Sequence, residues 1–275
     1  EAEPLKGLDG VICHNRKIND SYLRNCLFES SENKRNFFLI GGSQMSSLSL
    51  GLKKKLDKDN HYHLTGSLHI YMPNFEKIFF NEKGKDEYFF ELNNLAENLF
   101  SNINQESIIL IGARFPVHIN EEFFNNYESG AEKDSWNGVY KHIDNPFLDW
   151  KEIFKEKITY LAKNENIKII LLYPIPEVGF DVPRRVAQEY KFFPYKQLDT
   201  SFDIFKKRTR TSFELLNSIK GDSIYRIYPH TIFCDSFIKN RCVTKNKDEI
   251  FYSDDDHLST NGVRLINQLI INKIN

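Results

Sequence analysis

Five short segments of the chain carry the apolar or alternating pattern that is typical of β-strands. They are residues 37–40, 60–65, 107–111, 167–172 and 223–228. Near-continuous apolar runs such as residues 107–111 and 167–172 favour strands that are buried on both faces of a parallel sheet.

Helical spacing fills most of the chain between these segments. Apolar residues recur every three or four positions in residues 45–55, 86–100, 150–161 and 202–219, and again from Val263 to the C-terminus. Strands that alternate with helices predict a doubly wound parallel sheet of about five strands, with helices on both faces in a three-layer α/β/α fold. In such sheets ligands bind at the carboxyl ends of the strands.

Two long segments show neither pattern, and we predict that they are loops. Residues 67–84 are rich in aromatic side chains, and residues 115–146 are mainly polar but contain Tyr127, Trp136 and Tyr140. A loop as long as the second is usually functional or mobile in a compact domain. Its aromatic rings either stack on sugar faces or pack together in a local aromatic cluster.

A serine stands where the first predicted strand meets a helix. Gly41 and Gly42 break the strand, and Ser43 then opens the helix of residues 45–55. This order exposes a serine hydroxyl at the end of a strand and directs the first N–H groups of the helix toward an oxyanion. The same pattern fits an ordinary turn in which Ser43 is an N-cap. The chain has neither glycine-rich nucleotide fingerprint, so a nucleotide site is not predicted.

The second notable stretch contains three aspartates and a histidine just before the last helix. Asp254 and His257 are three residues apart, a spacing that lets a tight loop fold the carboxylate onto the imidazole and fix its tautomer. The other ring nitrogen then takes a proton from a nucleophile. We expect Asp256 to point away from His257, and Asp255 to face solvent or cap the helix. An acidic, solvated N-cap is the alternative for the whole stretch.

Together the Gly-x-Ser turn and the Asp-x-x-His-Leu-Ser stretch resemble the SGNH hydrolase superfamily. The closer resemblance is to the extracytoplasmic SGNH domain fused to membrane acyltransferase-3 proteins, and residues 108–115 and 173–183 fit that subgroup as well. The resemblance covers about residues 35–275. The chain departs from the family at Gly42 and Gln44, where an acid and a histidine are usual, and at Arg114, near the position of an oxyanion asparagine.

The resemblance implies a Ser-His-Asp triad made of Ser43, His257 and Asp254. Ser43 would accept an acyl group, expected to be acetyl, and pass it to a sugar hydroxyl of a bacterial cell-surface polysaccharide such as an O-antigen. The oxyanion is expected at the backbone N–H of Ser43, the N–H of Gly66 and the Arg114 side chain. Serine chemistry of this kind requires no cofactor or metal.

The resemblance also implies partners and a location. The acetyl group would come from a membrane acyltransferase-3 domain in the same chain or in a partner, and the protein would be periplasmic or extracytoplasmic and tethered to the inner membrane. A carbohydrate acetylesterase is the enzymatic alternative, because water then replaces the sugar hydroxyl. A glycan-binding module with a decayed site is the third possibility, which the departures at Gly42 and Gln44 permit.

Composition adds limits to this interpretation. A length of 275 residues suits one large domain, which we place at residues 35–275, with residues 1–34 as an extension or linker region packed on it. The net charge of −1 predicts no nucleic-acid surface. No apolar run approaches the roughly 18 residues of a membrane span. Because the chain begins without Met, we expect a processed chain or a fragment of a longer one.

Four cysteines form two local pairs, Cys13 with Cys26 and Cys234 with Cys242. Their spacing does not fit a zinc site, and an even count in local pairs favours two disulfides in an oxidising compartment over four reduced thiols. The family has a cysteine pair where Cys234 and Cys242 stand. The histidines at positions 61, 63 and 69 lack a carboxylate at ligand spacing, so we expect surface or edge-strand histidines rather than a metal site.

Overall fold

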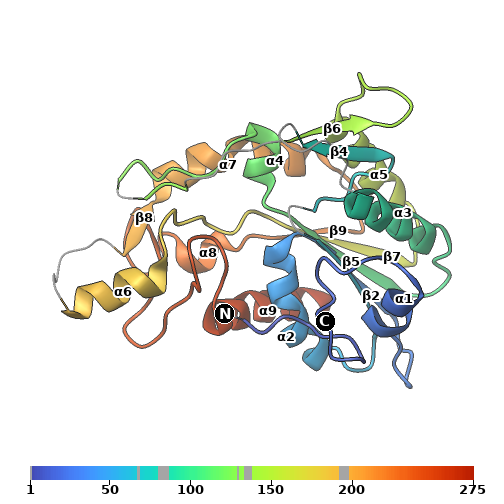
Figure 1. Cartoon of the computed structure of the whole chain (residues 1–275), viewed down its shortest axis with the longest axis horizontal. Coiled ribbons are helices and arrows are strands. Elements are labelled where there is room, and N and C mark those ends of the chain that lie inside the picture. Colours follow the sequence, from blue (N-terminus) through green and yellow to red (C-terminus); the bar gives the residue numbers. More distant parts are fainter. Residues whose placement is uncertain (1, 67–68, 80–86, 129, 133–137, 192–197) are drawn as a thin grey trace.

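The computed structural model describes residues 2–66, 69–79, 87–128, 130–132, 138–191 and 198–275. These residues form a central sheet with helices on both of its faces (Figure 1). None of the helices in these ranges is both long enough and apolar enough to cross a membrane.

The central sheet has six strands in the order β1-β3-β2-β5-β7-β9. Five of them are parallel: β3 (Asn60–Thr65), β2 (Asn36–Gly41), β5 (Ser107–Gly112), β7 (Ile167–Leu172) and β9 (Ile224–Ile227). The predicted doubly wound sheet of about five parallel strands is therefore confirmed. The sixth strand, β1 (Leu27–Phe28), is a two-residue antiparallel edge, too short to give a pattern in the sequence.

Two apolar cores lie on opposite faces of the sheet, because successive side chains of a strand point to opposite sides. Phe37 and Leu39 of β2 join the core under α2 (Ser43–Lys55) and α9 (Thr260–Ile274). Phe38 and Ile40 join the other core, under α3 (Glu87–Ser101), α5 (Trp150–Leu161) and α7 (Phe202–Ser218). This arrangement gives three layers.

The predicted loops contain regular structure. β4 (Phe75–Phe79) pairs with β6 (Gly138–His142), and α4 (Phe115–Asn120) follows β5, so the prediction of loops is wrong in these parts. Pairing between segments so far apart leaves no local signal. The ring of Tyr140 packs against His118 of the same segment at 5.7 Å and against Phe89 of α3 at 5.4 Å. Tyr140 is thus part of an aromatic cluster that extends beyond the segment, whereas Tyr127 is exposed. Trp136 lies outside the described residues.

Other short elements surround the sheet. They are α1 (Asp20–Cys26), α6 (Val182–Lys191), α8 (His230–Phe233) and an antiparallel pair formed by β8 (Asp199–Ser201) and β10 (Arg241–Val243).

The N-terminal segment is fixed to the edge of the sheet. The Cys13–Cys26 disulfide lies in a small core with Leu5, Tyr22 and Phe28, and the Tyr22 hydroxyl donates to the carbonyl of His63 in β3. The Cys234–Cys242 disulfide joins the end of α8 to Cys242 in β10. Both cysteine pairs are thus bonded as expected.

The expectation of surface or edge-strand histidines is wrong. His61, His63 and His69 are all buried. For His61 and His63, β1 pairs along the outer side of β3 and removes β3 from the edge of the sheet. His69 lies after β3 and packs against the ring of Phe89 at 5.5 Å.

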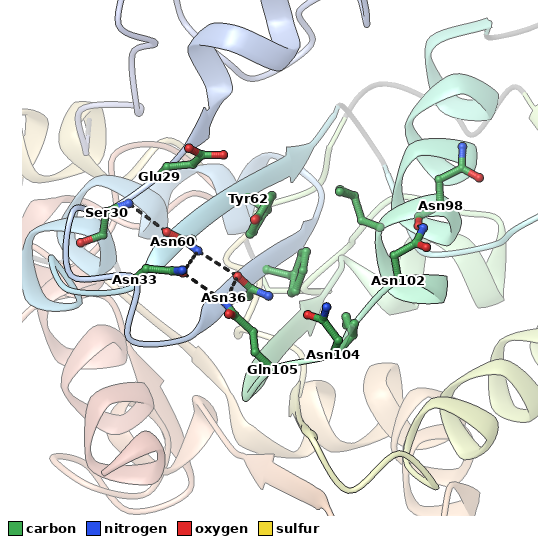
Figure 2. A pocket seen from close by; sticks show the side chains of 13 residues that line it. Glu29, Ser30, Asn33, Asn36, Asn60, Tyr62, Asn98, Asn102, Asn104 and Gln105 are labelled. Atoms are coloured by element: carbon green, nitrogen blue, oxygen red, sulfur yellow. Dashed lines mark hydrogen bonds between the residues drawn. The ribbon is translucent and has the colours of Figure 1, made fainter.

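Neutral amides tie together the amino ends of the parallel strands (Figure 2). Asn60 and Gln105 both donate to the Asn36 side-chain oxygen, at 3.0 and 2.8 Å, and the N–H of Ser30 donates to Asn60 at 2.9 Å. A hollow of about 460 Å³ lies beside them. Its described lining includes Glu29 and Ser30, but the Ser30 hydroxyl donates to the backbone carbonyl of Asp57 at 3.1 Å.

Two glycines connect β2 to α2, and they differ in what they require. Gly41 has a φ of +147°, and a Cβ there would lie 1.8 Å from the Gly112 carbonyl oxygen and 2.5 Å from Cγ of Met45. Gly42 has a φ of −82°, and its nearest neighbour would be 3.7 Å from an added Cβ. Only Gly41 is therefore required by the backbone.

Gly41→Ala should lower the free energy of unfolding by about 3 kcal/mol or more, because it combines backbone strain with a clash against a β5 carbonyl that cannot move away. Gly42→Ala is the matched control and should unfold at nearly the wild-type denaturant midpoint. Guanidinium unfolding followed by circular dichroism measures both. Equal midpoints for the two variants would show that the approach of β2 to β5 is not constrained in this way.

Candidate active site

Ser43 lies at the carboxyl end of β2, where the sequence analysis expected it. Its Oγ is 2.7 Å from Nε2 of His257, a residue 214 positions away in the chain. Gly42, not Ser43, is the N-cap of α2, and it provides no side-chain cap. The ordinary N-cap alternative for Ser43 is thus wrong, and its hydroxyl is directed to the imidazole.

The loop that presents His257 is closed by its own aspartate. Asp254 Oδ1 accepts the backbone N–H groups of Asp256 and His257 at 2.9 and 2.6 Å, and its Oδ2 lies 2.8 Å from Nδ1 of His257. The N–H of Ser253 donates to the carbonyl of His257 at 2.9 Å. A carboxylate that accepts nearby backbone N–H groups is a common way to fix such a turn. The three-residue spacing therefore brings this carboxylate and imidazole together.

Asp256 does not point away from His257, and that expectation is wrong. Its Oδ1 lies 3.0 Å from Nδ1 of His257, and its Oδ2 lies 3.3 Å from Nη1 of Arg114. The buried Arg114 cation holds the carboxylate inward. Asp255 does not cap α9, because Ser259 does so; its side chain is partly exposed, as the solvent alternative expected, and its backbone carbonyl accepts the N–H of Val178 at 2.8 Å.

Arg114 is buried among carboxylates. Its Nε donates to Glu177 at 2.7 Å, its Nη2 bonds Glu132, and its Nη1 faces Asp256. Arg208 donates to the second oxygen of Glu177 at 3.0 Å. Each nitrogen of the Arg114 guanidinium thus faces a carboxylate, so the structure uses Arg114 to hold Asp256, and the expected oxyanion role is not supported.

Gly66 is also engaged elsewhere. Its N–H donates to the carbonyl of Gly41 at 3.1 Å, and its own carbonyl accepts the N–H of His69 at 3.1 Å. This hydrogen bond continues the parallel pairing of β2 with β3 at their carboxyl ends, so the expected oxyanion donor is already used.

Gln44, which departs from the family pattern, ties the two halves of the site together. Its side-chain amide donates to the backbone carbonyl of Asp256 at 2.9 Å. The first turn of α2 is thereby held against the loop that carries His257, which explains how the local hydrogen bonding differs from the family pattern.

The charges of the site act on the imidazole. Burial lowers the pKa of His257, but the hydrogen bonds and negative charges of Asp254 and Asp256 outweigh burial and raise its pKa above the ordinary value. Burial opposes ionisation of Asp254, yet its hydrogen bond to His257 lowers the pKa of the carboxyl. Burial raises the pKa of Glu132 to about 7. The site therefore favours an imidazolium beside carboxylates.

A cavity of about 220 Å³ opens beside Ser43 and His257. One wall comes from the N-terminal segment, which the sequence analysis did not connect with the site. The pattern of residues around His14 gives no signal for this position, because only the three-dimensional path of the segment brings it there. The lining residues are Ala2, Pro4, Ile12, His14, Ser43, Ser46, Ser47, Ser253, His257 and Leu258.

Within the described residues, two overlapping sets bring three potential metal-ligand atoms within 4.8 Å of one another. They are Asp254, Asp256 and His257, and Glu132, Asp255 and Asp256. The Nδ1 of His257 already faces two carboxylates, and Arg114 provides the positive charge beside Glu132 and Asp256. The carboxylates of Asp254, Asp256 and Glu132 therefore have protein partners.

Comparison with known proteins adds three findings. A family model described as the SGNH domain fused to AT3 domains matches residues 12–272. The periplasmic domain of a lipopolysaccharide acetyltransferase from Salmonella ser. Paratyphi A has a similar fold, with 19% identity, a TM-score of 0.58, and coverage of 97% of this chain and 92% of that domain. An acetyl xylan esterase from Butyrivibrio proteoclasticus, 11% identical, has a TM-score of 0.37 over 90% of this chain and 64% of its own. No curated protein sequence matches the chain.

Asp256→Asn should lower the pKa of His257 by about one unit, because it removes one of the two negative charges beside Nδ1. Asp255→Asn should change that pKa much less, since the largest upward influences on His257 come from Asp254 and Asp256. Titration of the His257 ring protons by NMR measures both variants. An unchanged pKa in Asp256→Asn would mean that Arg114 fully cancels the charge of Asp256 at the imidazole.

Proposed function

The chain belongs to the family of SGNH domains that are fused to AT3 domains, and on that premise we propose that it is a serine-dependent O-acetyltransferase acting on a bacterial cell-surface polysaccharide. One observation carries the proposal. Ser43 Oγ, the His257 ring and the Asp254 carboxylate form a continuous chain of hydrogen bonds of 2.7 and 2.8 Å at the carboxyl end of the sheet. This is the arrangement that makes a serine hydroxyl nucleophilic.

The first half of the reaction acylates Ser43. The N–H at Nδ1 of His257 donates to Asp254, so Nε2 has the lone pair that accepts the hydroxyl proton. As Ser43 Oγ bonds to the acetyl carbonyl carbon, its proton moves to Nε2 and the carbonyl electron pair moves to oxygen. When the pair returns, the bond to the donor's leaving group breaks and that group takes the proton from Nε2.

The second half transfers the acetyl group. A sugar hydroxyl attacks the carbonyl carbon of the acetylated serine and gives its proton to Nε2 of His257. The bond to Ser43 Oγ then breaks, and this oxygen recovers the proton. The raised pKa of His257 favours the imidazolium that forms in each half.

Asp256 and Arg114 act on the imidazole without touching the reacting atoms. Asp256 lies at the same ring nitrogen as Asp254, and Arg114 restrains it. The two carboxylates share the orientation of the ring, with Asp254 also fixing the loop through two backbone N–H groups. Asp254 is therefore the acid of the proposed triad, and Asp256 is a positioning residue.

The surroundings support a small acyl group and an external acceptor. The cavity of about 220 Å³ has the short or branched side chains of Ala2, Ile12 and Leu258 in its wall, which suits acetyl. The likeness to a lipopolysaccharide acetyltransferase periplasmic domain supports a polysaccharide acceptor, and the two disulfides fit an extracytoplasmic location. The family's fusion to AT3 domains supports such a domain as the source of the acetyl group.

A carbohydrate acetylesterase would use the same acyl-enzyme. The His257 side chain is 31% exposed, so water reaches the site as a sugar hydroxyl does. Incubation with an acetyl donor and oligosaccharide acceptors, followed by mass spectrometry, separates the two functions. Acetylated oligosaccharide identifies the transferase, and free acetate with unmodified oligosaccharide identifies the esterase.

Ser43→Ala should abolish turnover of an aryl acetate while the protein stays folded, since loss of a triad member typically costs several orders of magnitude in rate. A serine-directed phosphonate should label the wild-type protein at Ser43 and leave the variant unlabelled, as peptide mapping would show. Wild-type rates in the variant would exclude Ser43 as the nucleophile. Absence of labelling in the wild type would favour a glycan-binding module.

Asp254→Asn should lower kcat/KM by about 10⁴-fold, because an amide cannot hold the imidazole in the required tautomer. Asp255→Asn, the neighbouring control, should lower it by less than about tenfold through loop stability alone. Measurement on one aryl acetate compares them. A crippled Asp255→Asn beside an active Asp254→Asn would refute this assignment of the triad.

The dependence of kcat/KM on pH should separate Asp254 from Asp256. His257 must be neutral to accept the Ser43 proton, so activity should rise with pH through its raised pKa, above the ordinary value of about 6.5. In Asp256→Asn this rise should move to lower pH, with a smaller loss of maximal rate than in Asp254→Asn. An unmoved profile would mean that Asp256 does not act on the imidazole.

A further inference from the structure

The proposed reaction develops a negative charge on the acetyl oxygen, and such a charge needs hydrogen-bond donors. The N–H of Ser43 stands at the start of α2. The N–H of Gly66 is used by Gly41, and the Arg114 nitrogens face carboxylates. One donor is therefore still required, and the pocket wall beside Ser43 contains an imidazole, that of His14.

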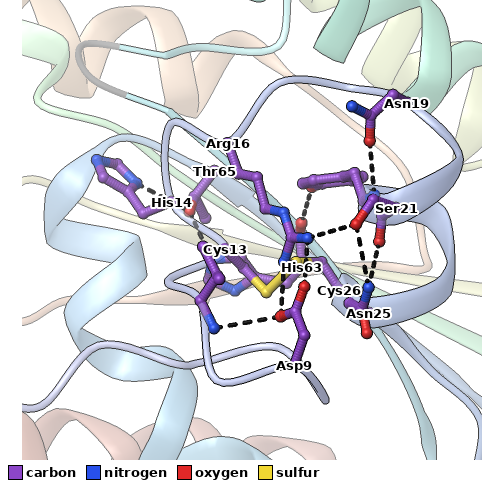
Figure 3. Close-up of a disulfide and its surroundings, with 12 residues drawn as sticks. Asp9, Cys13, His14, Arg16, Asn19, Ser21, Asn25, Cys26, His63 and Thr65 are labelled. Atoms are coloured by element: carbon purple, nitrogen blue, oxygen red, sulfur yellow. Dashed lines mark hydrogen bonds and ion pairs between the residues drawn. A yellow bond between two sulfur atoms is a disulfide. The ribbon is translucent and has the colours of Figure 1, made fainter.

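His14 is the end of a chain of hydrogen bonds that begins in the sheet (Figure 3). Its Nδ1 lies 3.0 Å from the hydroxyl of Thr65, and the same hydroxyl lies 2.7 Å from Nε2 of His63. His63 and Thr65 belong to β3. The His14 ring is thus attached to a rigid strand through one nitrogen.

The direction of the chain follows from the other nitrogen of His63. Its Nδ1 is buried and has no hydrogen-bond partner among the described residues. A buried N–H without an acceptor is costlier and rarer than a buried lone pair, so the proton of neutral His63 belongs on Nε2, which donates to Thr65. The single hydrogen of the Thr65 hydroxyl is then donated to Nδ1 of His14, and neutral His14 carries its own proton on Nε2.

Both imidazoles are neutral at physiological pH. Burial, together with the charge of His257, lowers the pKa of His14 to about 4. Burial, together with His14 and His61, lowers the pKa of His63 to about 3. A neutral imidazole with a fixed N–H donates a hydrogen bond without releasing its proton.

A disulfide holds this imidazole in place. Cys13, the residue before His14, is bonded to Cys26, and the N–H of Asn15 donates to the carbonyl of Thr65 at 3.4 Å. Arg16 bridges Asp9 and Ser21 across the same loop. The loop is therefore anchored on both sides of His14, as a preorganised donor requires.

Resting on the acyl transfer proposed above, we propose that Nε2–H of His14 donates to the oxyanion on the acetyl carbon attacked by Ser43. The N-terminal segment thereby completes the oxyanion site. Its imidazole takes the place of the oxyanion asparagine that is usual in the family near the position of Arg114. In this role His14 is a catalytic residue of the reaction, and Thr65 and His63 are positioning residues that fix its tautomer.

His14→Phe tests the role, because phenylalanine keeps a planar ring of similar size and removes the donor. On an aryl acetate, kcat/KM should fall by about 10²–10³-fold, as for other lost oxyanion donors. The fall should come from kcat, and KM should stay within threefold of the wild-type value. Affinity for an acetyl trifluoromethyl ketone, which forms an oxyanion on Ser43, should fall in parallel. Ser49→Ala, in α2 but outside the cavity lining, loses only a hydroxyl that donates to the carbonyl of Ser46; it is the control and should stay within twofold.

Three outcomes separate the inferences. If kcat/KM of His14→Phe falls by less than threefold, or if KM rises while kcat stays at the wild-type value, the role of His14 is overturned and the triad stands. A fall in kcat/KM without a fall in affinity for the ketone also overturns the role of His14. A donor to the oxyanion would stabilise the ketone adduct, so its loss would weaken ketone binding as well. A wild-type protein that neither reacts with phosphonate nor cleaves the acetate overturns the acyl transfer and this role together.

The tautomer is measured independently of activity. Nitrogen-15 shifts and long-range proton couplings of the His14 ring should place the proton on Nε2. Thr65→Val should remove that preference, because Nδ1 then loses its donor. A wild-type proton on Nδ1 overturns the inference, since Nε2 would then present a lone pair to the oxyanion.

Discussion

The hydrogen bond between Ser43 and His257 joins two parts of the chain that lie 214 residues apart, and the packing of two helices maintains it. Asn267 of α9 donates to the carbonyl of Leu48 in α2 at 3.1 Å. At Gly51 an added Cβ would lie only 2.4 Å from the Asn267 amide, so the helices touch where a side chain would separate them. The distance between Ser43 and His257 is maintained because α2 and α9, which follow them in the chain, cannot move independently.

Buried charge is the second constraint on the site. Arg114 is surrounded by Glu132, Glu177 and Asp256, and loss of its charge would leave Glu132 buried without a cation and Asp256 with the imidazole alone, which is strongly destabilising. The cluster is linked to the imidazole through Asp256. The electrostatic setting of His257 therefore depends on Arg114 between β5 and α4, on Glu132 after α4 and on Glu177 after β7, which only the folded chain brings together.

The departures from the family pattern have local explanations. At Gly42 there is room for a side chain, as the 3.7 Å distance from an added Cβ to its nearest neighbour shows, so the missing acid leaves the turn intact. At Gln44 the amide bonds the Asp256 carbonyl. The residues at these two positions are compatible with an assembled site. They therefore give less support to a glycan-binding module with a decayed active site.

The sequence by itself determined the parallel sheet, the position of Ser43 after the first of its parallel strands and the nearness of Asp254 to His257. Each depends on local information, namely apolar periodicity, a glycine turn and a three-residue spacing that a tight loop can close. Only the tertiary structure decided that Asp256 turns inward, that Arg114 serves carboxylates and that His14 reaches the pocket. Those placements depend on contacts between segments distant in the chain, where burial and charge pairing override local preference.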